Sequence, residues 1–367
     1  MTVRSHPHAD IRIGIVGCGR AAATLHVPAL RRLRGVAVVA VSDCDAERSR
    51  HLASQCAGAT SYPNYHDLLT DQRVDLVAVC VPAALHAAVA SAAFESGKHV
   101  FIEKPLALTL DDCDHLVEQA LRGQARGIRS AVGFNLRSHR LVHQASAMIQ
   151  AGHLGEIEML RTLWTADWSG NTRPPWHAVR EHGGGALIEI GTHLADLWRH
   201  LLASEVACIH TLSRSVAVDD QTAVFEGRMT SGVLVSAAVS QRTVSHNTIE
   251  VFGERGSLRL SCFHADSLEV SRSGAPVSGV WRRLGPMLSK VSRLPAALKA
   301  ARQGGDFQAS YSRQWGRIIG ALRGGEPMPA SVSDGREALR IVLAALRSSQ
   351  EGSVVSLTTP PASTLPA

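Results

Sequence analysis

The first 135 residues alternate between short runs of apolar residues and longer segments in which apolar positions recur at helical spacing. The apolar runs are rich in Val and Ile, as is typical of the buried strands of a parallel sheet. The runs cover residues 11–16, 36–41, 74–81, 99–102 and 128–134, and helices are predicted over about 20–33, 83–96 and 109–123. Strands that alternate with helices through short links predict a doubly wound parallel sheet.

The pattern changes after residue 135. A helix over about 138–151, a long strand over 156–168, a loop rich in Gly, Pro, Arg and His over 169–185 and a helix over 186–202 come first. Strand-like runs then follow one another at 208–216, 222–229, 233–240, 248–252 and 257–261. The short turns 230–232 and 253–256 are typical of hairpins, so a mostly antiparallel sheet is expected. Helices are predicted over about 289–302, 309–323 and 334–348.

Composition narrows the class of protein. A chain of 367 residues is long enough for about two domains. It contains no apolar run long enough to cross a membrane, and its first ten residues lack the core of a signal peptide. The seven cysteines are scattered without a Cys-x-x-Cys pair, which favours a reducing, cytoplasmic location and argues against a zinc site. The net charge of +6 is spread out, so neither nucleic acid nor membrane is expected as a partner.

A glycine-rich turn joins the first predicted strand to the first predicted helix. It reads Gly17-Cys18-Gly19-Arg20-Ala21-Ala22, a match to the G-x-G-x-x-G/A pattern in the strand–turn–helix context that gives the pattern meaning. Gly17 permits the tight turn, Gly19 lets a pyrophosphate approach the backbone, and Ala22 lets helix and strand pack closely. The free N–H groups of the helix N-terminus favour the phosphates. The turn therefore predicts a dinucleotide site.

The second strand ends at Ser42-Asp43, about 20 residues beyond the glycines, where the pattern asks for an acid. A carboxylate at this position binds both ribose hydroxyls and repels a 2′-phosphate. Asp43 therefore favours NAD over NADP as the cofactor.

The fourth apolar run leads directly into Glu103-Lys104-Pro105. Ligands of open parallel sheets lie just past the carboxyl ends of the strands, and proline fixes the local backbone. Lys104 is therefore expected to point its ammonium at the cleft, and Asn135 follows the fifth run at the same edge.

With these motifs the chain resembles the Gfo/Idh/MocA oxidoreductase family over about residues 10–350. The resemblance rests on the glycine motif with residues 26–30 (HVPAL), on Val81-Pro82 with His86, on 97–100 (GKHV) before Glu103-Lys104-Pro105, on 133–135 (GFN), and on 183–193 (GGGALIEIGTH). It implies an α/β protein: an N-terminal Rossmann doubly wound parallel sheet, then a C-terminal α+β domain with a large open, mostly antiparallel sheet. The expected bounds are 1–135 for the Rossmann domain, 136–350 for the substrate-binding and oligomerisation domain, and 351–367 for a flexible tail. The open sheet implies a homodimer or homotetramer, and a cis peptide is expected at Lys104–Pro105.

The resemblance also implies roles for single residues. Lys104 and His193 match the catalytic lysine and histidine of the family, and Glu189 stands where the family usually has Asp. The implied cofactor contacts come from Gly17, Cys18, Gly19, Arg20, Ala21, Asp43, Val81, Pro82, His86, Glu103, Lys104 and Asn135. Glu189 and His193 are spaced i and i+4 on a predicted helix, so they could touch either as a catalytic pair or as a helix-stabilising pair. No third metal ligand is evident beside them, so no metal is expected.

Oxidation of a secondary alcohol removes a proton from oxygen as a hydride leaves carbon. Histidine suits the proton step because its ordinary pKa is ~6.5, whereas lysine at ~10.4 does so only if its surroundings lower its pKa. The hypothesis is that His193 is the general base, that Lys104 polarises the oxygen and shares the proton relay, and that Glu189 orients a neighbouring group. The expected substrate contacts are Lys104, Glu189 and His193 together with Arg173, Trp176 and His177 of the loop, which suit a sugar or cyclitol.

Three functions remain open from the sequence. The first is a dehydrogenase that transfers a hydride between NAD and a secondary alcohol or ketone of a sugar, nucleotide sugar or cyclitol. The second is a glycosidase that uses NAD redox chemistry transiently. The third is a non-catalytic, ligand-sensing regulator of the same fold, against which the presence of both Lys104 and His193 counts.

Overall fold

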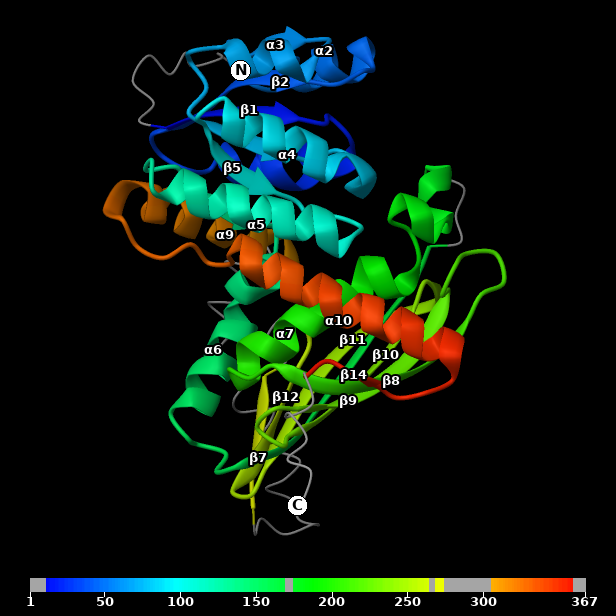
Figure 1. Cartoon of the computed structure of the whole chain (residues 1–367). Coiled ribbons are helices and arrows are strands. Elements are labelled where there is room, and N and C mark those ends of the chain that lie inside the picture. Colours follow the sequence, from blue (N-terminus) through cyan, green and yellow to red (C-terminus); the bar gives the residue numbers. More distant parts are fainter. Residues whose placement is uncertain (1–10, 169–173, 264–267, 274–304, 359–367) are drawn as a thin grey trace, which may run out of the picture. The chain divides into compact units, whose positions relative to one another are not determined.

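The computed structural model describes residues 11–168, 174–263, 268–273 and 305–358 (Figure 1). These residues form two compact units. The first unit comprises the described residues 11–140, 181–183 and 305–339, and the second comprises the remainder. The predicted helix over 289–302 lies outside the described residues.

A six-stranded sheet forms the centre of the first unit, with the strand order β3-β2-β1-β4-β5-β6. All of its neighbouring strands are parallel, which confirms the predicted doubly wound sheet. The strands are β1 (Ile11–Val16), β2 (Val36–Ser42), β3 (Thr60–Tyr62), β4 (Leu76–Val79), β5 (His99–Ile102) and β6 (Ser130–Val132). From β1 the chain adds β2 and β3 on one side of the sheet and then β4, β5 and β6 on the other, so the order of the strands switches sides between β1 and β4. Ligands of such sheets bind beyond the carboxyl ends of the strands at this switch point.

Helices cover both faces of this sheet. One face carries the π-helical turn η1 (Ala22–His26), α1 (Val27–Leu30) and α9 (Asp306–Gly324), whose Trp315 is fully buried in one cluster with Ile13 and Leu30. The other face carries α3 (Tyr65–Thr70), α4 (His86–Glu95) and α5 (Leu110–Gln124), and α4 and α5 lie side by side (Figure 1). The predicted bounds had assigned α9 to the second domain. That assignment is wrong, because the apolar side of α9 is buried against the first sheet.

The segment between β2 and β4 contains three elements that the apolar pattern did not indicate: α2 (Ala46–Ser54), β3 and α3. Each helix begins at a side-chain cap. The Asp45 carboxylate accepts from the backbone N–H groups of Glu47 and Arg48, and the Asn64 side chain accepts from His66. The predicted start of α5 is confirmed, since the Thr109 side chain accepts from the Asp112 N–H.

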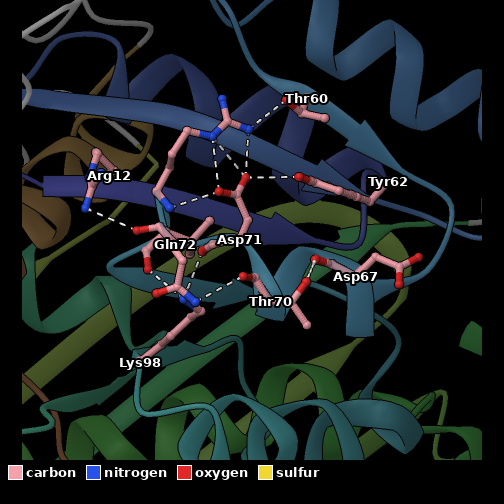
Figure 2. Close-up of polar contacts among 10 residues, drawn as sticks. Arg12, Thr60, Tyr62, Asp67, Thr70, Asp71, Gln72 and Lys98 are labelled. Atoms are coloured by element: carbon pink, nitrogen blue, oxygen red, sulfur yellow. Dashed lines mark hydrogen bonds and ion pairs between the residues drawn. The ribbon is translucent and has the colours of Figure 1, made fainter.

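A polar cluster fixes the amino end of β4 (Figure 2). It lies at the end of the sheet opposite the carboxyl ends of the strands. The Lys98 ammonium donates to the carbonyl oxygens of Asp71 (3.1 Å) and Val74 (2.8 Å). The Asp71 carboxylate in turn accepts from Tyr62 on β3 (3.1 Å). Burial lowers the pKa of Lys98, and its two carbonyl partners satisfy the buried ammonium. The cluster joins the edge strand β3 to the loop before β4.

The second unit is built on an eight-stranded sheet with the order β13-β12-β11-β7-β10-β9-β8-β14. Only the β7–β10 pair is parallel among the pairs of this sheet, which confirms the prediction of a mostly antiparallel sheet. The strands are β7 (Ile157–Asp167), β8 (Val206–Arg214), β9 (Thr222–Met229), β10 (Leu234–Ser240), β11 (Arg242–Gly253), β12 (Gly256–Leu260), β13 (Glu269–Arg272) and β14 (Val355–Ser356). β14 lies in the stretch expected to be a flexible tail. That expectation is wrong for these two residues, because they pair with β8 and Val355 is buried.

Helices cover one face of the second sheet. They are α6 (Arg140–Gln150), the π-helical turn η6 (Leu187–Gly191), α7 (Thr192–Leu202) and the part of α10 (Val332–Glu351) from residue 340 onward. Trp198 of α7 is fully buried, with its ring 5.2 Å from that of Phe225 on β9. The neighbouring Val224 points to the other face and is 51% exposed, so the strands alternate between a covered face and an open one.

Candidate active site

The turn after β1 can be made only by a glycine at position 17. Gly17 has a φ of +95°, and a Cβ there would lie 2.5 Å from the carbonyl oxygen of Cys80. Its N–H donates to the carbonyl oxygen of Ser42 at the end of β2 (2.8 Å). The turn is therefore held against the carboxyl ends of both neighbouring strands.

Gly19 has open space above its backbone. A Cβ added at this position would meet nothing within 4 Å. The helix begins immediately afterwards, with Arg20 exposed, Ala21 half-buried and Ala22 fully buried against the strand. Free N–H groups at a helix start and an unobstructed glycine suit a pyrophosphate, so the residues present fit a dinucleotide. The thiol of Cys18 is buried, which raises its pKa to about 12 and keeps it protonated.

The Asp43 carboxylate is fixed just past the end of β2. One oxygen accepts from the N–H of Cys18 (2.8 Å) and the other from the N–H of Asp45 (2.9 Å). Two backbone donors hold the carboxylate beside the glycine turn, where the ribose of a dinucleotide would lie.

Two further predicted residues follow β4, and His86 lies in the first turn of α4. Val81 is half-buried and Pro82 is exposed. His86 is almost fully buried, and its ring nitrogens lie 2.7 Å from the Pro105 carbonyl oxygen and 2.9 Å from that of Val81. Burial lowers the pKa of His86, although both carbonyl contacts favour the protonated ring and act to raise it. Both ring nitrogens face backbone carbonyl oxygens, so His86 braces the Lys104–Pro105 step, and its contact with a cofactor stays a prediction.

Lys104 is half-buried beyond β5 and precedes a cis peptide bond to Pro105. Its N–H donates to one carboxylate oxygen of Glu103 (3.1 Å), and the other oxygen lies 2.9 Å from Nε2 of His26. Burial would raise the pKa of Glu103, but His26 and Lys104 together hold it below its ordinary value. Gly133 is required beside this carboxylate, because a Cβ there would lie 2.8 Å from Glu103.

Asn135 follows β6 and is fully buried. Its amide nitrogen donates to the hydroxyl of Ser310 on α9 (2.8 Å). Within the part of the chain that the structure describes, its Oδ1 has no hydrogen-bond partner. A buried acceptor of this kind needs a donor, and the carboxamide of a nicotinamide offers one.

In the second unit, Glu189 of η6 and His193 of α7 are both nearly buried. The Glu189 carboxylate contacts Nδ1 of His177, which lies in the 3₁₀ turn η4 (Pro175–Ala178). The His193 ring is stacked on that of Trp164 from β7, with centroids 5.4 Å apart. The expected single helix over 186–202 is in fact a π turn followed by an α-helix, so the i, i+4 argument for Glu189 and His193 does not apply.

The loop that carries His177 closes tightly on itself. A Cβ at Gly184 would lie 2.3 Å from the His177 carbonyl oxygen, and the Gly185 N–H donates to that same oxygen (3.2 Å). Trp176 is stacked on His177 with ring centroids 3.6 Å apart. Arg173, the third residue predicted for substrate contact in this loop, lies outside the described residues.

Comparison with known proteins agrees with these motifs. Residues 11–128 match the family described as "Oxidoreductase family, NAD-binding Rossmann fold", and residues 142–259 match the "GFO/IDH/MocA C-terminal domain". Inositol 2-dehydrogenase 3 of Saccharopolyspora erythraea is 30% identical over 73% of this chain and 76% of its own length. The chain belongs to the Gfo/Idh/MocA family of oxidoreductases.

Two further comparisons cover nearly the whole chain of this Gfo/Idh/MocA member. The myo-inositol 2-dehydrogenase of Thermotoga maritima is 28% identical over 95% of this chain and 98% of its own length. A levoglucosan dehydrogenase solved in complex with NADH and levoglucosan has the same fold, with a TM-score of 0.77 and 20% identity over 95% of this chain and 99% of that one.

The strand order brings most of the predicted cofactor residues of this Gfo/Idh/MocA chain to one edge of one sheet. Gly17, Asp43, Val81, Lys104 and Asn135 follow five different strands of that sheet at their carboxyl ends. Lys104 belongs to the first unit, whereas Glu189 and His193 belong to the second. That Lys104 and His193 face one substrate carbon stays a prediction.

Sequence reasoning missed what surrounds Glu103. His26 had been noted only as part of a motif, yet it is fully buried and lies between Glu103 and Trp315, whose indole N–H donates to Nδ1 of His26 (3.0 Å). Tyr311 of α9 adds a second aromatic contact to the His26 ring, at 5.4 Å between centroids. No local signal links α9 to a motif nearly 300 residues earlier.

Three findings on the described residues complete the description. None of the described helices is long and apolar enough to cross a membrane. The described residues contain no group of three His, Cys, Asp or Glu side chains that could hold a metal ion. All seven cysteines are free thiols.

Proposed function

We propose that the protein is an NAD-dependent dehydrogenase that oxidises a secondary alcohol of a polyhydroxylated ring, a cyclitol or a sugar. The observation that carries the proposal is the position of Lys104. It follows β5 at the same sheet edge as the glycine turn after β1 and the fixed carboxylate after β2. An alcohol held beside the nicotinamide of a cofactor in that turn would lie next to a lysine ammonium. The similarity to two inositol dehydrogenases supports a ring substrate.

The side chains divide the chemistry as follows. NAD supplies the hydride acceptor when it is bound. Lys104 polarises the substrate oxygen, and His193 takes the proton from it, since its ordinary pKa of ~6.5 suits a base near neutral pH. Glu189 holds His177, and this pair orients a neighbouring hydroxyl of the ring.

The cofactor is NAD in preference to NADP. The carboxylate of Asp43 is fixed by two backbone N–H groups and cannot turn away from a ribose bound there. A negative charge in this place accepts from ribose hydroxyls and repels a 2′-phosphate. The Oδ1 of Asn135 is the proposed acceptor for the nicotinamide carboxamide.

The loop after β7 is the proposed substrate loop. Trp176 and His177 present a stacked pair of rings, which suits an apolar sugar or cyclitol face. Arg173 is proposed to bind an additional hydroxyl, carboxylate or phosphate of the substrate, since its guanidinium forms paired hydrogen bonds with such groups.

A substrate screen with two variants tests the proposal. NADH absorbance is followed with a panel of inositols, sugars and nucleotide sugars, first for the wild type and then for Lys104→Met and His193→Ala. We expect turnover to fall at least ~100-fold in each variant, the typical size of a lost acid–base group, with NAD still bound. His51→Ala is the control, because His51 is exposed on α2. Wild-type turnover in both variants would overturn the assignment.

The same screen separates the alternatives. Release of a free sugar without net NADH formation would identify a glycosidase. A shift in melting temperature with NAD and a ring compound, but without turnover by the wild type, would identify a sensing regulator.

The open face of the second sheet is proposed to bind a second copy of the chain, giving a homodimer or homotetramer. Leu212 on β8 and Val224 on β9 are directly paired there and are 67% and 51% exposed. Exposed apolar side chains that lie side by side on an open sheet face are typical of an interface. Multi-angle light scattering of the wild type and of Leu212→Glu tests this, and a monomeric wild type would refute it.

A cytoplasmic location is also proposed, because free thiols persist in a reducing compartment.

A further inference from the structure

The buried carboxylate of Glu103 has a histidine neighbour, His26, whose tautomer is fixed by geometry. Nδ1 of His26 accepts from the indole N–H of Trp315 (3.0 Å), and an indole nitrogen can only donate. The proton of His26 must therefore be on Nε2, which lies 2.9 Å from a Glu103 oxygen. A proton on Nδ1 would oppose the indole N–H, so this geometry selects the Nε2–H tautomer of His26.

The other oxygen of Glu103 is fixed as well. It accepts from the N–H of Lys104 (3.1 Å), and the first oxygen contacts the Nε2–H donor of His26 at 2.9 Å without meeting hydrogen-bond geometry. A carboxylate accepts on both sides, whereas a glutamine amide in the same place would set its NH₂ against one of the two donors. The site is therefore built for an ionised acid at this position.

Five titratable groups act on this carboxylate from the surrounding elements: His26, Cys80, His86, Lys104 and Tyr311. Burial raises the pKa of Cys80 and of Tyr311 well above their ordinary values, and the charge of Glu103 raises both further. Burial lowers the pKa of His86. Burial therefore keeps Cys80, His86 and Tyr311 uncharged at neutral pH, so none of these three offsets the charge of Glu103.

We propose that Glu103 is a positioning residue that the His26–Trp315 pair holds as an anion, and that it fixes the backbone of Lys104 and keeps its ammonium protonated. The inference rests on the proposed function for its purpose. An oxidised nicotinamide is cationic and would drive the proton off a lysine beside it. A fixed negative charge behind Lys104 offsets that effect. Lys104 then stabilises the developing negative charge on the substrate oxygen, and the proton leaves through another group.

The test measures the pKa of Lys104 directly. The chain has only four lysines, so the signals of ¹³C-labelled lysine side chains can be titrated by NMR and assigned with Lys104→Arg. In Glu103→Gln we expect the pKa of Lys104 to fall by about one unit or more, because a close opposite charge is removed. The basic limb of the turnover–pH profile should shift down by the same amount. Glu95→Gln, on the exposed end of α4, is the matched control and should change neither.

A second variant keeps the inference testable if Glu103→Gln does not fold. Trp315→Phe removes the indole donor, so ¹⁵N NMR of the imidazole should show the Nε2–H tautomer of His26 in the wild type and a mixture of tautomers in this variant. An unchanged pKa of Lys104 in folded Glu103→Gln, or a wild-type His26 whose proton is on Nδ1, would overturn the inference. A fall in the pKa of Lys104 without turnover of any ring alcohol would support this inference and refute the proposed function.

Discussion

Replacement of Gly19 by alanine should separate cofactor binding from folding. A Cβ at Gly19 meets no atom within 4 Å and its φ is not in the left-handed region, so the free protein should keep its stability to within about 0.5 kcal/mol. The added methyl would instead occupy the space through which a pyrophosphate approaches the backbone. Loss of one or two hydrogen bonds to a charged phosphate costs about 1.5–3 kcal/mol, or roughly a 10- to 150-fold weaker affinity for NAD.

Gly17→Ala is the matched comparison within the same turn. Its Cβ would overlap the backbone of Cys80 and Val81 at a φ of +95°, so we expect a loss of about 3 kcal/mol or more of folding stability. Isothermal titration calorimetry gives the dissociation constant for NAD, and urea unfolding of the free protein gives the stability. If Gly19→Ala bound NAD as tightly as the wild type, the turn would not be the pyrophosphate site. The reasoning would also fail if Gly17→Ala were as stable as the wild type.

Three further outcomes are expected. Asp43→Ser should lower the preference for NAD over NADP by at least ~10-fold in kcat/KM, because the charge that repels a 2′-phosphate is gone; an unchanged ratio would place the ribose elsewhere. Burial opposes ionisation of Asp334, but Arg137 and a Ser331 N–H lower its pKa, so its contribution to stability is present above about pH 4 and lost as the pH falls. Asp334→Asn should lower the free energy of unfolding by about 1.5–3 kcal/mol at pH 7. Below pH 4 the urea midpoint of the variant should depend less on pH than that of the wild type, and parallel midpoint–pH curves for the two proteins would refute this. Glu189→Asp should lower turnover about tenfold, the effect of losing ~1.4 kcal/mol, since the shorter side chain withdraws from His177.

The sequence predicted long, strongly patterned elements well and short ones poorly. β5 and β9 have the bounds that the apolar pattern predicts, because each combines β-branched or aromatic residues with a clear turn on both sides. β3 has three half-buried residues and β13 has four exposed ones, so neither shows the alternation that marks a strand. Both lie toward an edge of their sheet, where hydrogen bonding to one neighbour fixes the strand without burying its side chains.

The candidate site was predictable only where a motif is local. The glycine turn, Asp43 and Lys104 each follow a recognisable strand, and the carboxyl ends of parallel strands necessarily meet at one edge. Trp315 could not be assigned to that edge, because the helical pattern of α9 does not say which sheet it covers. The bracing role of His86 was missed for a similar reason, since it depends on the backbone of Pro105, a neighbour in space that follows the next strand.

Both π-helical turns carry a residue of the candidate site. η1 ends at His26 and η6 contains Glu189, and in each case apolar spacing had predicted an unbroken α-helix. A π turn holds more residues than an α turn and so changes which residues share a face. Each turn accompanies a pairing that α-helical spacing does not indicate: His26 contacts Glu103 and Glu189 contacts His177. The sequence therefore indicated Glu189 as a candidate and included His26 only within a motif, whereas the partners of these two residues depend on local departures from regular helix that hydrophobic periodicity does not encode.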